Sequence, residues 1–145
     1  MIFIYLTRII LTMNDIYTDG SCIKNNPKDS TGPGGWGFVI LGDVVIEGSG
    51  GELDTTNNRM EIQAVLEALK ICGESVKIHT DSMYVMNCAK GVWKRKLNTD
   101  LWKEYDSLTE HKTITWEKVK AHSGDVWNEY VDRLANAETQ KIKKC

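Results

Sequence analysis

The chain has 145 residues and a mass of 16.4 kDa, and it is 41% hydrophobic and 26% charged. This length predicts a single domain with a core large enough to need no disulfide, and the composition excludes a disordered or fibrous chain. The net charge of −2 lacks the positive excess typical of nucleic-acid-binding proteins, but it hides an asymmetry. Residues 1–85 carry six Lys and Arg against eleven Asp and Glu, whereas residues 86–145 carry twelve against nine.

The first twelve residues, MIFIYLTRIILT, are strongly apolar and contain one charge, Arg8. The run is too short to span a bilayer, and it lacks the charged start and the cleavage site of a signal peptide. Because Met13 stands directly before a predicted strand, we expect residues 1–12 to be an extension of a domain that covers residues 13–145. An added edge strand or a small apolar anchor is the alternative.

The four cysteines lie far apart, and no C-x-x-C pair or suitably spaced His indicates a zinc site. Nothing else suggests secretion, so we expect reduced thiols in a cytoplasmic protein, with Cys145 at a frayed end.

The first third of the chain predicts three strands. Residues 14–23 form the first strand, and residues 24–35 (KNNPKDSTGPGG) form a loop, because they hold both prolines and three glycines. Residues 36–41 and 44–50 are β-rich runs joined by a short connection at Gly42-Asp43, which is typical of a hairpin.

Helix and strand signals alternate in the rest of the chain. The first helix covers residues 59–72, follows the capping residues of LDTTNN and ends at Gly73. The later elements are a strand over 75–80, helices over 81–90 and 97–110, a strand over 113–120 and a helix over 126–144. A meander followed by strand–helix alternation predicts an α/β fold with a mixed sheet and helices on both faces.

Three carboxylates stand where the fold alone does not require them. Asp19 falls inside the first strand, Glu61 in the first turn of its helix, and Asp81 at the end of the strand 75–80. Each also has a structural interpretation, as a turn residue or a helix-start residue. If the two strands are parallel neighbours, Asp19 and Asp81 share the sheet end where ligands bind. A carboxylate cluster without His or Cys favours Mg²⁺ or Mn²⁺, and two such ions can promote phosphodiester hydrolysis.

Four segments, YTDGSC, TTNNRMEI, HTDSMYV and VKAHSGDVWNEYVDRLA, resemble type 1 ribonuclease H in order and spacing, over about residues 14–140. The resemblance implies a five-stranded mixed sheet, with three antiparallel strands followed by two parallel ones. It implies a monomeric endonuclease that cleaves the RNA strand of RNA–DNA hybrids and leaves 5′-phosphate and 3′-hydroxyl ends. Two Mg²⁺ ions, or Mn²⁺ in their place, would serve the reaction, and RNA primers and R-loops would be the targets.

The resemblance also assigns the catalytic residues. The carboxylates that match the family's metal ligands are Asp19, Glu61, Asp81 and Asp132, the last at the start of the final helix. His122 matches the mobile-loop His that transfers protons and aids product release; without the resemblance it would be a solvent-facing loop residue. Glu129, one turn before Asp132, resembles an auxiliary acid, and a surface position is the alternative.

Candidate substrate-binding residues follow from the same likeness. A polar cluster at the helix start resembles minor-groove and DNA-phosphate contacts, namely Thr55, Thr56, Asn57 and Asn58, which also suit a helix cap. Asn26 resembles another minor-groove contact, with Asn25 as the competing assignment because the preceding loop is longer than usual. Gly20, Ser21 and Cys22 would face the RNA strand through their backbone amides.

The chain departs from the family pattern after the second Asp, where relatives often carry a longer basic handle. Only Lys94, Arg95 and Lys96 remain here, beside Trp93. We therefore expect a truncated handle and a weak grip on the nucleic-acid backbone. Trp93 would either stack on a DNA sugar or anchor the helix junction.

Two other function classes compete with the hybrid nuclease. A hybrid-binding module without catalysis is disfavoured because the four acids are intact. A transposase- or resolvase-type DNA nuclease of the same superfold is disfavoured by TTNNRME and the final helix, although this rests on family likeness.

Overall fold

The computed structural model describes residues 13–144, so the expectations for residues 1–12 and for Cys145 lie outside the described part of the chain. The strands are β1 (Asn14–Cys22), β2 (Gly32–Leu41), β3 (Ile46–Thr55), β4 (Ser75–Thr80) and β5 (Thr113–Lys118). The helices are α2 (Asn57–Leu69), α3 (Met83–Ala89), α4 (Thr99–Thr109) and α5 (Val126–Lys143). The predicted order of elements is confirmed.

The five strands form one sheet in the order β3-β2-β1-β4-β5. β1 pairs antiparallel with β2, and β2 pairs antiparallel with β3. β4 joins the other side of β1 in parallel, and β5 continues in parallel beside β4. The predicted mixed sheet is therefore confirmed, and the carboxyl ends of the central strands β1 and β4 lie at the same end of the sheet.

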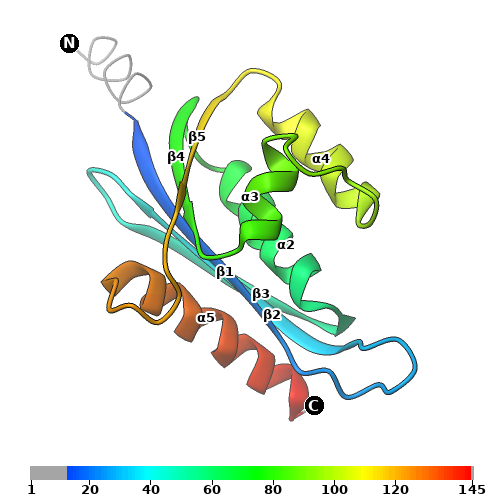
Figure 1. Cartoon of the computed structure of the whole chain (residues 1–145). Helices are drawn as coiled ribbons and strands as arrows, with labels where there is room; N and C mark the ends of the chain where they lie inside the picture. The colour runs from blue at the N-terminus through cyan, green and yellow to red at the C-terminus, as the bar shows by residue number, and fades with distance from the viewer. Residues whose placement is uncertain (1–12, 145) are drawn as a thin grey trace, which may run out of the picture.

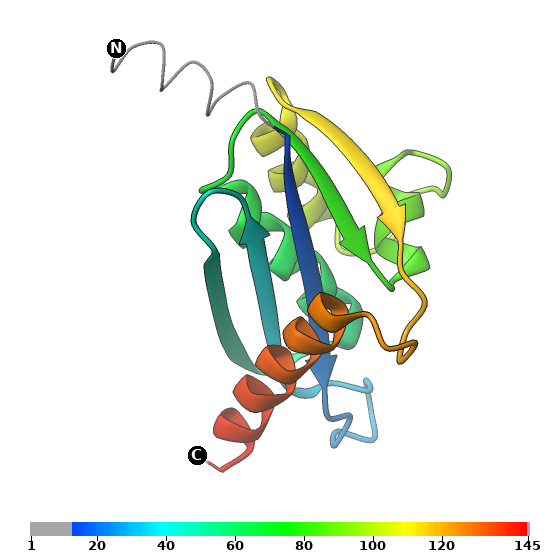
Figure 2. The same cartoon turned by 90° about the vertical axis from the view of Figure 1, so that its left-hand side faces the viewer.

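The helices cover the two faces of the sheet unequally (Figures 1 and 2). α5 crosses one face over β1, β2 and β3, whereas α2, α3 and α4 lie against the other face. None of the described helices is long and apolar enough to cross a membrane.

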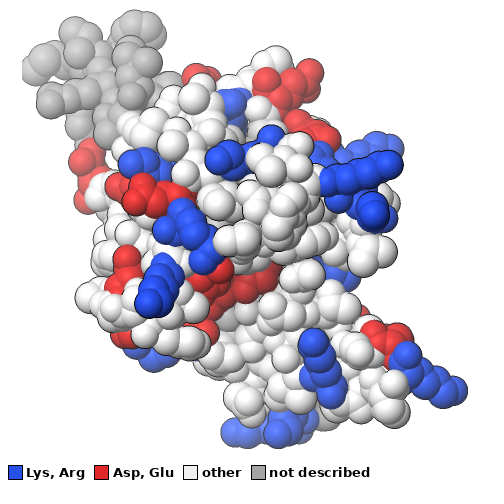
Figure 3. Space-filling view, in the orientation of Figure 1, with Lys and Arg blue, Asp and Glu red and all other residues white. Residues whose placement is uncertain are grey.

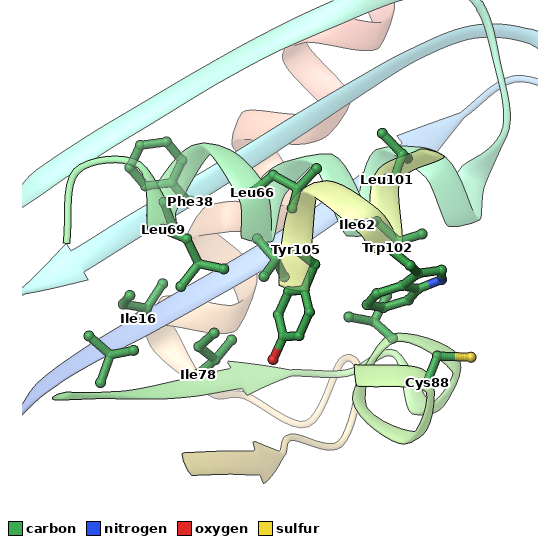
Figure 4. Packing of buried hydrophobic residues seen from close by; sticks show 14 of the residues in the cluster. Ile16, Phe38, Ile62, Leu66, Leu69, Ile78, Cys88, Leu101, Trp102 and Tyr105 are labelled. Atoms are coloured by element: carbon green, nitrogen blue, oxygen red, sulfur yellow. The ribbon is translucent and has the colours of Figure 1, made fainter. Parts of the chain in front are cut away.

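The main core lies between the sheet and α2, with α4 closing it from outside (Figure 4). Ile16 and Ile78, from the paired strands β1 and β4, are fully buried and meet Leu66 of α2 in this core. Trp102 of α4 is 2% exposed and packs edge-on against Tyr105. Every second residue of β4 is buried in this core, and the residues between them face the other side of the sheet. Asp81, just beyond the strand, continues the second set.

The prediction of a loop over residues 24–35 is wrong at its end, because residues 32–35 (GPGG) belong to β2. The glycines are required by packing. A Cβ at Gly35 would collide with the carbonyl oxygen of Ala135, and one at Gly37 would come within 2.7 Å of the Leu134 Cβ. The missing side chains let α5 lie directly on the backbone of β2, a tertiary contact that the local turn signal does not reveal.

Several predicted boundaries also shift. The connection between β2 and β3 spans residues 42–45, longer than the Gly42-Asp43 connection expected. α2 begins at Asn57, because the Thr56 hydroxyl accepts a hydrogen bond from the Arg59 amide and caps the helix. Glu61 therefore lies in the second turn and not in the first. The helix ends at Leu69, and Gly73 lies beyond its cap.

The final helix shows a similar shift. Asp125 caps α5 by accepting from the Asn128 amide at 2.9 Å. Asp132 is therefore in the second turn of α5, rather than at the helix start as expected.

Candidate active site

Three carboxylates from three different elements converge at the end of the sheet. Asp19 comes from β1, Glu61 from α2, and Asp81 from the junction of β4 and α3. Each has an oxygen within 4.8 Å of an oxygen of the other two. The parallel pairing of β1 and β4 brings Asp19 and Asp81 to one end, and the packing of α2 on β1 adds Glu61.

Gly20 makes the meeting of Asp19 and Glu61 possible. A Cβ at this position would collide with the backbone nitrogen of Glu61, so strand and helix touch backbone to backbone here. The Gly20 amide donates to Asp19 Oδ1 at 2.9 Å and holds that carboxylate in place. Glycine is thus a geometric requirement of the site and not only a turn residue.

Burial dominates the electrostatics of the cluster. Asp19 is 4% exposed and Glu61 is 5% exposed. Loss of solvation, with the charge of Asp81 and a hydrogen-bonding contact to Asp132 adding to it, raises the pKa of Asp19 to about 7. Burial, with the neighbouring Asp19 adding to it, raises the pKa of Glu61 well above its ordinary value. Burial and mutual repulsion therefore favour the protonated forms of Asp19 and Glu61 in the metal-free cluster.

Asp81 has a more balanced environment. Burial raises its pKa, while the side-chain amide of Asn128 and the positive charges of Lys118 and His122 oppose that rise. Asp132 adds repulsion from the side of α5. Asp132 is outside the group of oxygens within 4.8 Å of one another, but it lies close enough to raise the pKa of both Asp19 and Asp81.

The donor set suits a divalent metal ion. Glu61 Oε2 is buried without a hydrogen-bond partner among the described residues, which is costly unless another group satisfies it. Carboxylate oxygens are the ligands of hard cations such as Mg²⁺ and Mn²⁺. In the space-filling view, acidic atoms line a recess near the middle of the face, with cationic side chains around it (Figure 3). Asp19, Glu61 and Asp81 could therefore hold the metal, with Asp132 at the border.

His122 lies in the loop between β5 and α5 and is exposed. Its backbone is left-handed, with φ of 54°, and Gly124 follows with φ of 90°. The Ser123 hydroxyl donates to the Lys120 carbonyl at 2.6 Å and closes the turn. The strained turn presents the imidazole to solvent on the side of Asp81, where a proton could be exchanged with a bound substrate.

A pocket of about 560 Å³ opens at the N-terminus of α2. Four of the residues predicted to bind substrate line it, namely Cys22, Thr56, Asn57 and Asn58. Lys24, Leu97 and Asn98 complete the lining and were not predicted. Asn98 lies 39 residues from Arg59, whose guanidinium donates to it, so only the fold brings the two sides of the pocket together. Thr55, next to the pocket, is 2% exposed.

The side chains of two residues predicted to bind substrate, Ser21 and Asn26, have partners within the protein. The Ser21 hydroxyl donates to Asn136 Oδ1 of α5 at 2.7 Å, so its side chain faces that helix. Asn26 accepts from the Lys28 amide at 3.0 Å and shapes the loop between β1 and β2. The prediction at Ser21 concerned its backbone amide, whereas its carbonyl oxygen accepts from the Thr139 hydroxyl.

The short basic segment divides into inward and outward side chains. Arg95 points inward, where it donates to the carbonyls of Cys88 and Ala89, pairs with Asp106 at 2.8 Å and lies over the ring of Trp102 at 4.9 Å. Trp93 is 44% exposed, and Lys94 and Lys96 are exposed beside it. Arg95 thus serves packing, which differs from the substrate contact expected, and the other three remain available to a ligand.

Asn128 is the residue near the carboxylates that the sequence analysis missed. It is 3% exposed and contacts Asp81 from α5. The neighbouring Glu129 is half-buried and is absent from the group of oxygens within 4.8 Å. The helical spacing from Asp132 to Asn128 was a usable signal, since residues four apart share a helix face.

Comparisons with known proteins identify relatives over most of the chain. The RNase H family model matches residues 12–140. Ribonuclease H of Marinobacter nauticus is 42% identical over 146 aligned residues, which cover 88% of this chain and 94% of that protein. Ribonuclease HI of Caulobacter vibrioides is 43% identical, covering 83% of this chain and 89% of that protein.

Solved structures share the fold. The N-terminal RNase H domain of a Mycobacterium tuberculosis protein, solved as a fusion with maltose binding protein, has a TM-score of 0.78 and 25% identity, covering 91% of this chain and 96% of that chain. LC11-RNase H1, solved in complex with an RNA/DNA hybrid, has a TM-score of 0.73 at 24% identity, and the match covers 88% of this chain and 97% of that chain. With the family model matching most of its length and the carboxylates gathered at the sheet end, this chain belongs to the ribonuclease H family of metal-dependent endonucleases.

Proposed function

We propose that this protein hydrolyses the RNA strand of RNA–DNA hybrids, with two divalent metal ions bound by Asp19, Glu61, Asp81 and Asp132. The observation that carries the proposal is the convergence of three buried or half-buried carboxylates within 4.8 Å, with Glu61 Oε2 unpaired. The relatives named ribonuclease H support the substrate, and a neighbour of the same fold was solved with an RNA/DNA hybrid.

The metal supplies the part of the chemistry that no side chain here offers. When bound, two Mg²⁺ or Mn²⁺ ions would activate a water molecule for in-line attack and stabilise the leaving 3′ oxygen, which gives 5′-phosphate and 3′-hydroxyl ends. Asp19 and Glu61 are held by the contact at Gly20, so their oxygens are oriented before any ligand arrives. Low exposure excludes bulk water and strengthens every charge interaction at the cluster.

His122 would handle a proton at the edge of the site. His is the side chain that most often serves as a general acid or base, and His122 sits here on an exposed loop, where its charge acts on Asp81. Loss of this side chain should lower the rate by an amount typical of one general acid–base group, about 10²-fold or more.

The pocket at the start of α2 would select the substrate. Thr56, Asn57 and Asn58 offer hydroxyl and amide groups that can read 2′-hydroxyls and sugar–phosphate oxygens across a shallow minor groove. Cys22 lines the same pocket, and the backbone amides of Gly20, Ser21 and Cys22 would face the RNA strand. Asn26, or Asn25, would contribute from the loop before β2.

Trp93, Lys94 and Lys96 would contact the DNA strand from the short segment between α3 and α4. Arg95 would support them from beneath, as its inward contacts indicate. We further propose that the enzyme acts as a cytoplasmic monomer in the removal of RNA primers and R-loops.

The test is cleavage of one labelled 20-mer presented as an RNA–DNA hybrid, as double-stranded RNA and as double-stranded DNA. Each substrate is incubated with MgCl₂, MnCl₂ or EDTA. We expect cleavage of the hybrid RNA alone, and only with metal. Cleavage of the DNA duplex would favour a DNA nuclease of the same fold, and hybrid binding without cleavage would favour a catalytically inactive binding module.

A further inference from the structure

Asn128 is a buried amide at the border of the carboxylate cluster. It lies on α5 four residues before Asp132, so both residues share one face of the helix. Its exposed fraction is 3%, although Asn is a residue type that is mostly found exposed. Its backbone amide is fixed by the capping carboxylate of Asp125, so the first turn of α5 holds the position rigidly.

The side-chain amide of Asn128 lies beside the Asp81 carboxylate and lowers the pKa of that group. The Asn128 Oδ1 is buried and has no hydrogen-bond partner among the described residues. A buried amide oxygen left without a hydrogen bond destabilises the fold. Its presence here therefore points to a hydrogen-bond donor that the polypeptide does not supply.

A hydrated divalent cation would bring such donors. Mg²⁺ usually keeps several of its water molecules when carboxylates bind it, and the hydrogens of those waters point away from the ion. An amide suits this position because it combines a donor for Asp81 with an acceptor for water. A carboxylate at the same position would repel Asp81, and an aliphatic side chain would do neither.

We propose that Asn128 is a positioning residue of the cation site: its NH₂ group holds Asp81 in the orientation that ligates the metal, and its Oδ1 accepts a hydrogen bond from a water molecule of the hydrated ion. The inference rests on the metal site of the proposed function and assigns a role to a side chain outside the four carboxylates.

The first test measures metal binding directly. Asn128→Ala and wild type are titrated with MgCl₂ and with MnCl₂ by isothermal titration calorimetry. Loss of a residue that orients a metal ligand should weaken affinity about 10- to 100-fold. High MgCl₂ should then restore most of the hybrid cleavage, because the four carboxylates remain. Asn136→Ala is the matched control, since Asn136 lies on the same helix and contacts Ser21 rather than the cluster.

A second variant keeps the inference testable if Asn128→Ala folds poorly. Asn128→Asp has the same shape but places a negative charge against Asp81. We expect this variant to melt at a lower temperature than wild type in EDTA. Adding MgCl₂ should raise its melting temperature by more than it raises that of wild type. Equal gains in melting temperature for this variant and wild type would overturn the inference.

The failures can be told apart. If wild type binds Mg²⁺ and Asn128→Ala binds it within twofold as tightly, the inference about Asn128 is wrong and the proposed function stands. If wild type binds neither ion, or cleaves the hybrid equally well in EDTA, the metal site itself is wrong.

Discussion

At the scale of single residues, the carboxylate cluster is a site where function works against stability. Asp19 and Glu61 are almost fully buried, and the described residues provide no cation in direct contact to neutralise them. Such clusters destabilise the metal-free fold, because buried like charges must either repel one another or take up protons. Removing one of these charges should therefore raise the stability of the metal-free protein while it lowers the activity.

Asp19→Asn should make the metal-free protein more stable and inactive. The change removes a buried negative charge and keeps the shape of the side chain, so the free energy of unfolding in EDTA should rise by on the order of 1–3 kcal/mol. Turnover of the hybrid should fall by about 10²–10³-fold or more, because a group that stabilises the transition state through charge is lost. Chemical denaturation and a cleavage assay measure the two effects. A variant with near wild-type turnover would refute the assignment of Asp19.

The raised pKa of Asp19 predicts how stability depends on pH. Its pKa is about 7 in the folded protein and 3.8 in the ordinary reference state, so between these values the folded state binds more protons than the unfolded state. The free energy of unfolding in EDTA should therefore fall as pH rises from about 4 to about 7, by a few kcal/mol, since each unit of pKa difference is worth about 1.4 kcal/mol.

Denaturation at pH 5.5 and pH 8 in EDTA measures this dependence. MgCl₂ at pH 8 should recover the lost stability by replacing the protons. In Asp19→Asn the free energy of unfolding should differ less between pH 5.5 and pH 8 than it does in wild type. An unchanged difference in free energy would assign the effect to another group.

At the scale of elements, Arg95 anchors the short segment between α3 and α4. Arg95 joins the carbonyls at the end of α3 to Asp106 and Trp102 of α4. Its side chain is 24% exposed, so both its hydrogen bonds and its stem contribute to packing. Trp93, Lys94 and Lys96 are therefore presented from a fixed loop.

Arg95→Ala should lower the free energy of unfolding by about 1–3 kcal/mol, because charged hydrogen bonds and a cation–π contact are lost. The KM for the hybrid should rise more than kcat falls, since the carboxylates proposed to be catalytic lie on other elements. Lys94→Ala is the comparison, which should raise KM without changing the melting temperature. A stable Arg95→Ala protein with the same KM defect as Lys94→Ala would instead indicate a direct contact of Arg95 with substrate.

The packing of α5 on β2 depends on glycine. Gly35→Ala places a methyl group against the Ala135 carbonyl, which α5 can relieve only by moving away. We expect a loss of about 1–3 kcal/mol in the free energy of unfolding, as for other overpacked sites. Metal affinity should weaken too, because Asp132 and Asn128 move with the helix. Gly73→Ala is the control, since no atom lies within 4 Å of its added Cβ, and it should stay within about 1 kcal/mol of wild type.

At the scale of the whole molecule, the net charge of −2 does not exclude a polyanionic substrate. Four of the acids belong to the candidate metal site, and bound cations would offset them. Three lysines, Lys24 at the pocket and Lys94 and Lys96 on the loop, are exposed where the hybrid would lie. Few phosphate contacts predict modest affinity that depends on salt.

With about three phosphates neutralised, the slope of log Kd against log salt concentration should be near 2.7, or about 40-fold weaker binding from 50 to 200 mM salt. Fluorescence anisotropy with Asp19→Asn, which would bind the hybrid without cleaving it, measures this slope. Lys94→Ala should reduce the slope by about 1. Lys70→Ala should leave it unchanged, because Lys70 lies at the far end of α2 and pairs with Glu67 and Glu104. A slope unchanged in Lys94→Ala would place the substrate away from the loop.

Sequence alone determined the order of the nine described elements and the mixed sheet, because hydrophobic periodicity and capping residues are local signals. It also singled out Asp19, Glu61 and Asp81, because the fold alone does not require carboxylates at these positions. It predicted a loop at residues 32–35, where packing against α5 instead favours a strand. It also placed Glu61 in the first helical turn, whereas the Thr56 cap starts the helix at Asn57.

Only the tertiary structure decided which side chains meet. Three features join residues from different elements. Arg95 packs over Trp102, Asn57 and Asn98 line one pocket, and the buried amide of Asn128 lies beside Asp81. A sequence states that these residues are polar or charged but not which face of the fold receives them. The physical reason is that burial and hydrogen-bond pairing are properties of packed elements, and packing is settled by contacts between residues far apart in the chain.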